Sequence, residues 1–246
     1  WATVIACAGE IQRLEPDSAE GWFLSGLAVK VEKKPLKAIA AFERALQLDP
    51  RRYDAAVELA NQYSIARRNA EAAAMLAKYE AALANSPLYL DLAATVYTEI
   101  GLAEKAWPLY VKANEVQPGV DLFQANLATC AVYLGKIEEA REIYLKLLER
   151  FPDHRRNHYQ LSRLQKARDF AHIERMKEIL ARGDAPPEHN IPLYFAIAKE
   201  LEDLEQWDES FEYYRKAGDA VTKVANYDVA TDIALIDKVI EVCDVE

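Results

Sequence analysis

The sequence is poor in the residues that form turns and flexible loops. Its 246 residues include only 8 glycines and 10 prolines, whereas 51% of them are hydrophobic. So little glycine leaves few sites for β-hairpins, and no Gly-rich phosphate-binding loop occurs. Ala, Leu, Glu and Lys, which favour helices, are plentiful. The composition therefore predicts long helices around a sizeable apolar core.

Cysteine is also scarce. Cys7, Cys130 and Cys243 are odd in number and far apart, which does not suggest a disulfide framework. We interpret them as small buried hydrophobic residues in a reducing compartment, which predicts a cytoplasmic protein. The sequence contains no run of about 18 apolar residues and no signal peptide with a cleavage-site context. We therefore expect no membrane-spanning segment.

Signatures of catalytic and metal chemistry are missing as well. His154 and His158 have the spacing of two metal ligands on a helix, but they straddle a predicted helix start and lack a third ligand. His172 is isolated in the sequence. We interpret the acidic stretches 200–203 and 208–209 as solvated helix surface, not as paired catalytic carboxylates. We expect no metal site, no cofactor site and no catalytic residue in this chain.

The charge of the chain is strongly acidic and unevenly distributed. A net charge of −10 argues against nucleic-acid binding, because neutralising phosphates requires clustered Lys and Arg. Residues 150–182, however, contain nine Lys and Arg against four Asp and Glu, whereas residues 188–246 contain five against fifteen. This basic segment in an acidic chain points to an acidic partner.

Five prolines recur at multiples of a single interval. Their spacings are 34, 68, 34 and 34 residues, and Ala84 occupies the missing place, in the series Pro16, Pro50, Pro118, Pro152, Pro186. Such a period is typical of repeat arrays. It divides the chain into paired-helix units at 19–52, 53–86, 87–120, 121–154, a divergent 155–190, and 191–224. Residues 1–18 are half of an earlier unit, and 225–246 are expected to form a C-terminal capping or linker helix.

Two places in each unit hold small residues. The eighth place holds Gly26, Ala60, Ala94, Ala128, Ser162 and Ala198. The twentieth place holds Ala38, Ala72, Ala106, Ala140 and Ser210. Small residues at both places let two helices approach to near the lower end of the usual range of about 8–10 Å. We expect the large residue four places later to fill the groove between them, at Phe42, Leu76, Tyr110, Tyr144 and Tyr214.

The connections inside the units also follow a pattern. Gly101 and Gly135 lie where a left-handed backbone is expected between two helices. The equivalent places hold larger residues in four other units, where we expect local strain, at Lys33, Arg67, Asp169 and Glu205. In the divergent unit, a second helix in a shifted register is predicted by the spacing of Ile173, Met176, Ile179 and Leu180.

Small residues at the eighth and twentieth places, an aromatic residue at the twenty-fourth and proline at the thirty-second are similar to the tetratricopeptide repeat. The resemblance covers 1–154 and 191–224 and is weak at 155–190. It implies an all-α, right-handed α-solenoid in which stacked helix pairs form a concave binding surface. It also implies a scaffold that binds a protein or a peptide.

In such arrays the first helix of each pair lines the concave face. The residues expected there include the candidate ligand-binding set Asn61, Asn126, Arg156, Tyr159, Arg163, Lys166 and Lys199. For the two amides, solvated side chains or caps of local backbone groups are the alternative interpretation. The steps of three and four residues from Arg156 to Lys166 predict one face of a helix. Because guanidinium groups bind carboxylates in a bidentate fashion, this face suits an acidic peptide or protein surface, although a charge run is also typical of a solvated face.

The C-terminal part has a more specific likeness. Residues 190–243 resemble the last repeat and linker helix of bacterial tetratricopeptide-repeat sulfotransferases, in the stretches 192–204, 207–211, 227–228 and 234–240. The resemblance implies that a catalytic domain follows Glu246 and that this chain recruits its substrate or docks on that domain. In the alternative interpretation the array docks on its own catalytic domain or on a second subunit, and no external peptide enters.

Overall fold

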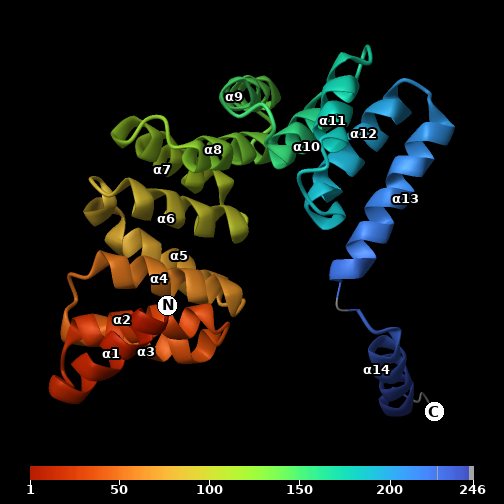
Figure 1. The fold of residues 1–246 in the computed structure, drawn as a ribbon. Coiled ribbons are helices and arrows are strands. Elements are labelled where there is room, and N and C mark those ends of the chain that lie inside the picture. The colour runs from red at the N-terminus through yellow and green to blue at the C-terminus, as the bar shows by residue number, and fades with distance from the viewer. Residues whose placement is uncertain (226, 244–246) are drawn as a thin grey trace. The chain divides into compact units, whose positions relative to one another are not determined.

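The computed structural model describes residues 1–225 and 227–243. Within these residues the chain forms fourteen α-helices and two 3₁₀ segments, and it has no β-strand (Figure 1). The predicted all-α fold is confirmed. None of the helices in this described part combines the length and the apolar composition that crossing a membrane demands.

The first helix of every pair begins at the first residue of a predicted unit. A lone helix α1 (Ala2–Leu14) precedes the pairs. The pairs are α2 (Ala19–Val31) with α3 (Pro35–Leu48), α4 (Tyr53–Ile65) with α5 (Asn69–Tyr79), α6 (Pro87–Glu99) with α7 (Ala103–Val116), α8 (Asp121–Tyr133) with α9 (Ile137–Arg150), α10 (Arg155–Leu164) with α11 (Ala171–Ala181), and α12 (Ile191–Asp203) with α13 (Trp207–Val224). The 3₁₀ segments are η1 (Glu80–Leu83) and η2 (Pro187–Asn190), and α14 (Val229–Val242) is the last helix.

The chain folds as two compact units, Trp1–Ile143 and Tyr144–Glu246, which we call unit 1 and unit 2. The core of unit 1 is built from α2 to α8, with large buried side chains that include Phe42, Leu59, Leu76 and Tyr97. The core of unit 2 joins α11 to α12 through Ile173, Met176, Ile179, Leu193, Ile197 and Leu201. The helix predicted in a shifted register is therefore present, as α11.

The predicted small residues are all buried, and they allow the helices of a pair to approach closely. A methyl group at Gly26 would lie 2.4 Å from Cε1 of Phe42, a distance that real contacts do not reach. In the last pair the Ser210 hydroxyl donates to the Ala198 carbonyl at 2.8 Å, which joins α13 to α12. Close crossing is thus built into the sequence of the pairs that carry small residues at both places.

The large residue at the twenty-fourth place is buried in four of the five predicted cases, and Tyr214 is the exception. Its side chain is 37% exposed, and its hydroxyl donates to Glu202 at 2.9 Å. The prediction that Tyr214 fills a groove is wrong. In the earlier units a following helix covers this place, whereas no residue of α14 between Val229 and Val242 is buried.

Three-residue turns with a left-handed middle residue connect most pairs. The φ angles are 82° at Gly101 and 57° at Lys33, and positive φ also occurs at Gly135, Arg67 and Glu205. The next residue donates its N–H to a carbonyl five residues back, as from Leu102 to Tyr97. This is the Schellman arrangement. A non-glycine residue in this conformation costs about 1–2 kcal/mol, so the predicted strain exists in these turns.

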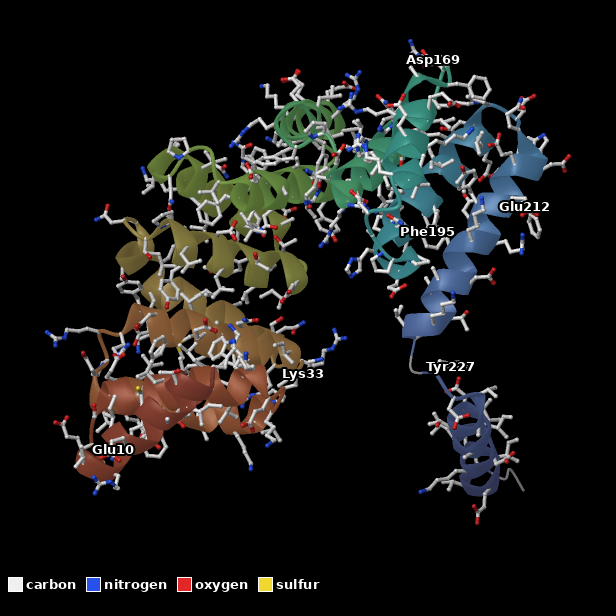
Figure 2. All side chains as sticks on the ribbon, in the orientation of Figure 1. Glu10, Lys33, Asp169, Phe195, Glu212 and Tyr227 are labelled. Atoms are coloured by element: carbon white, nitrogen blue, oxygen red, sulfur yellow. The ribbon has the colours of Figure 1, made fainter. Side chains whose placement is uncertain are left out.

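Asp169 does not adopt the left-handed conformation, so the prediction of strain there is wrong. A longer connection, residues 165–170, replaces the three-residue turn between α10 and α11 (Figure 2). Asp169 instead accepts a hydrogen bond from the backbone N–H of Ala171 at 2.9 Å and so helps to begin α11.

Of the three cysteines, only Cys130 is buried, and the prediction is wrong for Cys7 and Cys243. Cys7 lies on α1, which packs mainly against α2 and leaves its other faces to solvent. Cys243 follows α14, which buries none of its residues. The predicted cap at 225–246 is helical over Val229–Val242, and its residues 226 and 244–246 lie outside the described part of the chain.

Replacing Ala106 by leucine tests the close crossing. Ala106 is fully buried in α7, where it is packed in the core with α6. We expect Ala106→Leu to lower the free energy of unfolding by about 1–3 kcal/mol, because added methyl groups overpack the site. Chemical denaturation measures the change, with Glu104→Leu on the exposed face of α7 as the control. Equal stability of Ala106→Leu and the parent chain would contradict the close approach.

Candidate ligand-binding surface

The predicted site residues are divided between the two units. Asn61 and Asn126 lie on α4 and α8 of unit 1. The other five belong to unit 2: Arg156, Tyr159 and Arg163 lie on α10, Lys166 follows α10, and Lys199 lies on α12. Each unit therefore has to be considered separately.

In unit 1, the two predicted amides have different surroundings. The side chain of Asn61 is half-buried and forms no hydrogen bond to the described residues. The Asn126 amide donates to both carboxylate oxygens of Asp91, at 3.2 and 2.9 Å, and so links α8 to α6. Asp91 is 5% exposed, and burial raises its pKa to about 6, although the bond from Asn126 opposes the rise. Sequence reasoning did not find this pair, because its members are 35 residues apart.

In unit 2, four exposed cations have no carboxylate partner among the described residues. These are Arg156, Arg163, Lys166 and Arg168, which we call the basic patch. Neighbouring Arg155, by contrast, donates to Asp184 at 2.6 Å and to Asn190 at 2.7 Å. The basic patch therefore keeps its positive charge available, whereas Arg155 is neutralised inside the fold.

Lys166 does not continue the face of α10, because the helix ends two residues before it. The prediction of one helical face is wrong at this residue. The Lys199 ammonium donates to the carbonyl of Gln165 and to Asp203, and Asp203 accepts the N–H of Ala167 at 2.8 Å. These bonds from α12 satisfy backbone groups that a continuing helix would use. Lys199 thus positions the segment that carries Lys166, and its own charge is paired with Asp203.

Three aromatic rings from three helices lie next to the basic patch. The ring centres of Tyr159 and Phe195 are 6.4 Å apart, and those of Phe195 and Tyr214 are 6.2 Å apart. We call these three residues the aromatic strip (Phe195 is labelled on α12 in Figure 2). The guanidinium of Arg163 lies 5.5 Å from the centre of the Tyr159 ring. The aromatic strip and the basic patch therefore meet at α10.

A buried hydrogen-bonded chain of side chains joins α10, α11 and α12. His158 is 1% exposed, and its Nε2 lies 2.8 Å from the carbonyl of Pro152. Its Nδ1 lies 2.8 Å from Nε2 of His172, whose Nδ1 is 2.6 Å from Glu200. The interpretations of His172 as isolated and of Glu200 as solvated surface are wrong. Residues 14 and 28 positions apart meet because the three helices pack together, and no local spacing reveals this.

The geometry of the hydrogen bonds from Pro152 to Glu200 fixes how many protons these side chains share. The Pro152 carbonyl only accepts, so Nε2 of His158 carries a hydrogen. A neutral His158 then accepts from His172, and one proton remains for the contact between His172 and Glu200. Three contacts hold three protons and no net charge, and a further proton on His158 breaks its contact with His172. The pKa of His158 is lowered to about 4, chiefly by burial, with His172 and Arg175 acting in the same direction and the bond to Pro152 and the charge of Asp153 opposing it.

Acid should weaken unit 2 through His158. Its pKa is depressed in the folded state, so the stability that it contributes is present above about pH 6.5 and is lost as the pH falls towards 4. The full loss amounts to about 3 kcal/mol. We expect His158→Gln to remove most of this pH dependence. Hydrogen exchange of the amides in α10 to α12 at pH 7 and pH 5, corrected for intrinsic rates, measures it. An equal loss in both proteins would contradict the proton count.

Asp91 should act in the opposite sense in unit 1. Its raised pKa means that its stabilising contribution is present below about pH 3.8 and is lost as the pH rises through 6. We expect Asp91→Asn to raise the free energy of unfolding by about 1–3 kcal/mol at pH 7.5, because a neutral amide is cheaper to bury. Denaturant unfolding followed at pH 7.5 and pH 4 measures both values. A gain of the same size at pH 4 would show that the charge of Asp91 is not the cause.

Comparison with known proteins identifies a repeat in the sequence and the fold of the chain. Residues 123–154 match the family model of the tetratricopeptide repeat. No curated protein matches the sequence. Among solved structures, PilF of Pseudomonas aeruginosa is 16% identical with a TM-score of 0.61, over 89% of this chain and 97% of PilF.

Two further structures show the same fold. YrrB, described as a TPR protein with an unusual peptide-binding site, is 16% identical with a TM-score of 0.54, over 85% of this chain and 97% of YrrB. Human IFIT1, solved as a dimer with PPP-AAAA, is 18% identical with a TM-score of 0.63, over 94% of this chain and 57% of IFIT1. Residues 123–154 are thus a tetratricopeptide repeat by sequence, and the chain has the all-α fold of tetratricopeptide-repeat proteins.

Proposed function

We propose that this chain is a non-catalytic scaffold that binds an acidic peptide or an acidic protein segment at the basic patch of unit 2. The observation that carries the proposal is the set of four exposed cations, Arg156, Arg163, Lys166 and Arg168, that have no carboxylate partner among the described residues. They lie in a chain whose net charge is −10. Protein interaction is the usual role of this fold.

The ion pairs around the basic patch support this interpretation. Lys177 pairs with Glu209 at 2.9 Å, Lys199 pairs with Asp203 at 2.6 Å, and Arg155 pairs with Asp184. Carboxylates are abundant in unit 2, yet none of those described reaches the patch. Gathering like charges costs repulsion in the unbound chain, and an anionic ligand removes it. Arginine also offers two parallel donors to one carboxylate, which favours Asp and Glu side chains or a C-terminus.

A finer part of the proposal concerns the enzyme with which the array works. The resemblance of 190–243 to the linker region of sulfotransferases supports a role as a substrate-recruiting or docking region beside such a catalytic domain. This association and the cytoplasmic location stay predictions from the sequence. A phosphosulfate-binding loop encoded downstream in the same reading frame would support the association.

Charge reversal tests the proposed function. We expect Arg163→Glu/Lys166→Glu to weaken binding of a fluorescein-labelled peptide that carries four glutamates by at least about tenfold, because two attractive contacts become repulsive. Raising the salt from 50 to 500 mM should weaken binding to the parent chain, because exposed charges are screened. Fluorescence anisotropy measures both effects.

The matched control is Lys216→Glu/Lys223→Glu on α13, which changes the net charge equally at exposed residues away from the patch. We expect it to bind the glutamate peptide nearly as well as the parent chain. Equal weakening by the two double variants would mean that only the total charge matters. Binding that resists both charge reversal and salt would reject the basic patch as the site.

A further inference from the structure

The spacing of the aromatic strip matches that of an extended peptide. Its ring centres are 6.4 and 6.2 Å apart, and the rings come from α10, α12 and α13 in turn. In a β-strand, side chains on the same face are two residues apart, a distance of about 6.4–6.8 Å that shortens when the strand is twisted. Two neighbouring rings can therefore contact residues i and i+2 of one extended segment.

The tilt of the rings favours a peptide over a nucleic acid. The ring planes meet at 52° between Tyr159 and Phe195 and at 59° between Phe195 and Tyr214. Each ring is therefore tilted relative to its neighbour. The strip does not present the parallel ring faces on which successive bases could stack. Aliphatic side chains, which have no required orientation, suit such a surface better.

The strip is held in place before a ligand binds. The Tyr214 hydroxyl is fixed by Glu202 at 2.9 Å, the ring of Tyr159 packs against the core of unit 2, and Arg163 lies over that ring. Side chains that are already ordered lose little conformational entropy on binding. The strip is thus a preformed surface rather than a set of mobile side chains.

The two ends of the strip differ in charge. Arg163 and Arg156 carry exposed positive charge on α10, at the Tyr159 end. At the Tyr214 end, the exposed carboxylate of Glu202 accepts a hydrogen bond from the Tyr214 hydroxyl and provides a negative charge. An acidic residue is attracted to the first end and repelled from the second, so a peptide with one acidic end binds in one orientation.

We infer that the aromatic strip and Arg163 form one directional site for an extended peptide with aliphatic residues at alternate positions and an acidic residue at one end. The aliphatic side chains lie on Tyr214, Phe195 and Tyr159, and the acidic residue reaches Arg163. This inference rests on the proposed function of the basic patch and adds the class of peptide that the patch selects.

Three labelled peptides of identical composition test the inference on the full chain. Glu-Glu-Ser-Leu-Ser-Leu-Ser-Leu has alternate leucines, Glu-Glu-Ser-Ser-Ser-Leu-Leu-Leu has them in a block, and Leu-Ser-Leu-Ser-Leu-Ser-Glu-Glu has the reverse direction. We expect the first to bind at least about fivefold more tightly than the second, because only alternate leucines match the spacing of the rings. The third can place its glutamates on Arg163 by binding in the opposite orientation, so we expect it also to bind more tightly than the second.

Variants of the strip identify the residues responsible. We expect Phe195→Ala and Tyr214→Ala each to weaken the first peptide by about tenfold, because each removes a preformed aromatic contact. Phe211→Ala, an exposed aromatic on the same α13 but outside the strip, is the matched control and should bind like the parent chain. Circular dichroism checks that each variant is folded, and Tyr214→Ala serves if Phe195→Ala does not fold.

The outcomes separate this inference from the proposed function. If Arg163→Glu/Lys166→Glu abolishes binding while Phe195→Ala and Tyr214→Ala leave it unchanged, the strip is rejected and the basic patch stands. Equal binding of the first two peptides also rejects the strip. If no peptide binds to the parent chain, or if charge reversal changes nothing, both proposals fail. Tighter binding of labelled oligo-uridine than of any peptide would overturn the inference in favour of a nucleic acid.

Discussion

The close approach of two helices at a pair of small residues is the constraint on which the rest of the structure depends. Gly26 illustrates it: the space of a single methyl group is already filled by the ring of Phe42. Because each pair is held so tightly, its outer faces are fixed in direction, and side chains on neighbouring pairs meet with little adjustment. The Asp91–Asn126 contact follows from this rigidity. The described part of the chain therefore presents a surface that no sheet or long loop supports.

The divergent repeat, residues 155–190, shows what happens when two helices do not cross closely at small residues. Its first helix, α10, is short, and its second helix, α11, follows a longer connection. Lys199 and Asp203 of α12 take over the backbone groups that the shortened helix leaves unsatisfied. The buried chain from His158 to Glu200 fastens the same three helices from within. The unit with the weakest repeat pattern thus relies on specific polar contacts, and it is also the unit that carries the exposed cations.

The sequence predicted what depends on periodic burial and missed what depends on contacts between distant residues. Helix starts at Ala19, Tyr53 and the later units follow from a repeated pattern of small and large residues, which local packing enforces. The exposure of Tyr214 could not be predicted, because it depends on whether another helix covers the last pair. The partners of Asp91 and His172 lie 35 and 28 residues away, and the repeated apolar pattern does not mark them as partners. Lys166 was misplaced because helical spacing does not show where a helix ends.

The left-handed turns have a consequence for how such arrays change over time. Lys33, Arg67 and Glu205 adopt the same left-handed backbone as Gly101 and Gly135, although they carry long charged side chains and glycine carries none. The helices on either side therefore impose the geometry of the joint, and the residue at its centre only tolerates it. A turn whose conformation is set by its flanking helices can connect one helix of this kind to another, whatever residue stands at its centre. Gene duplication and recombination can thus lengthen, shorten or shuffle the array at these points without inventing a new connection.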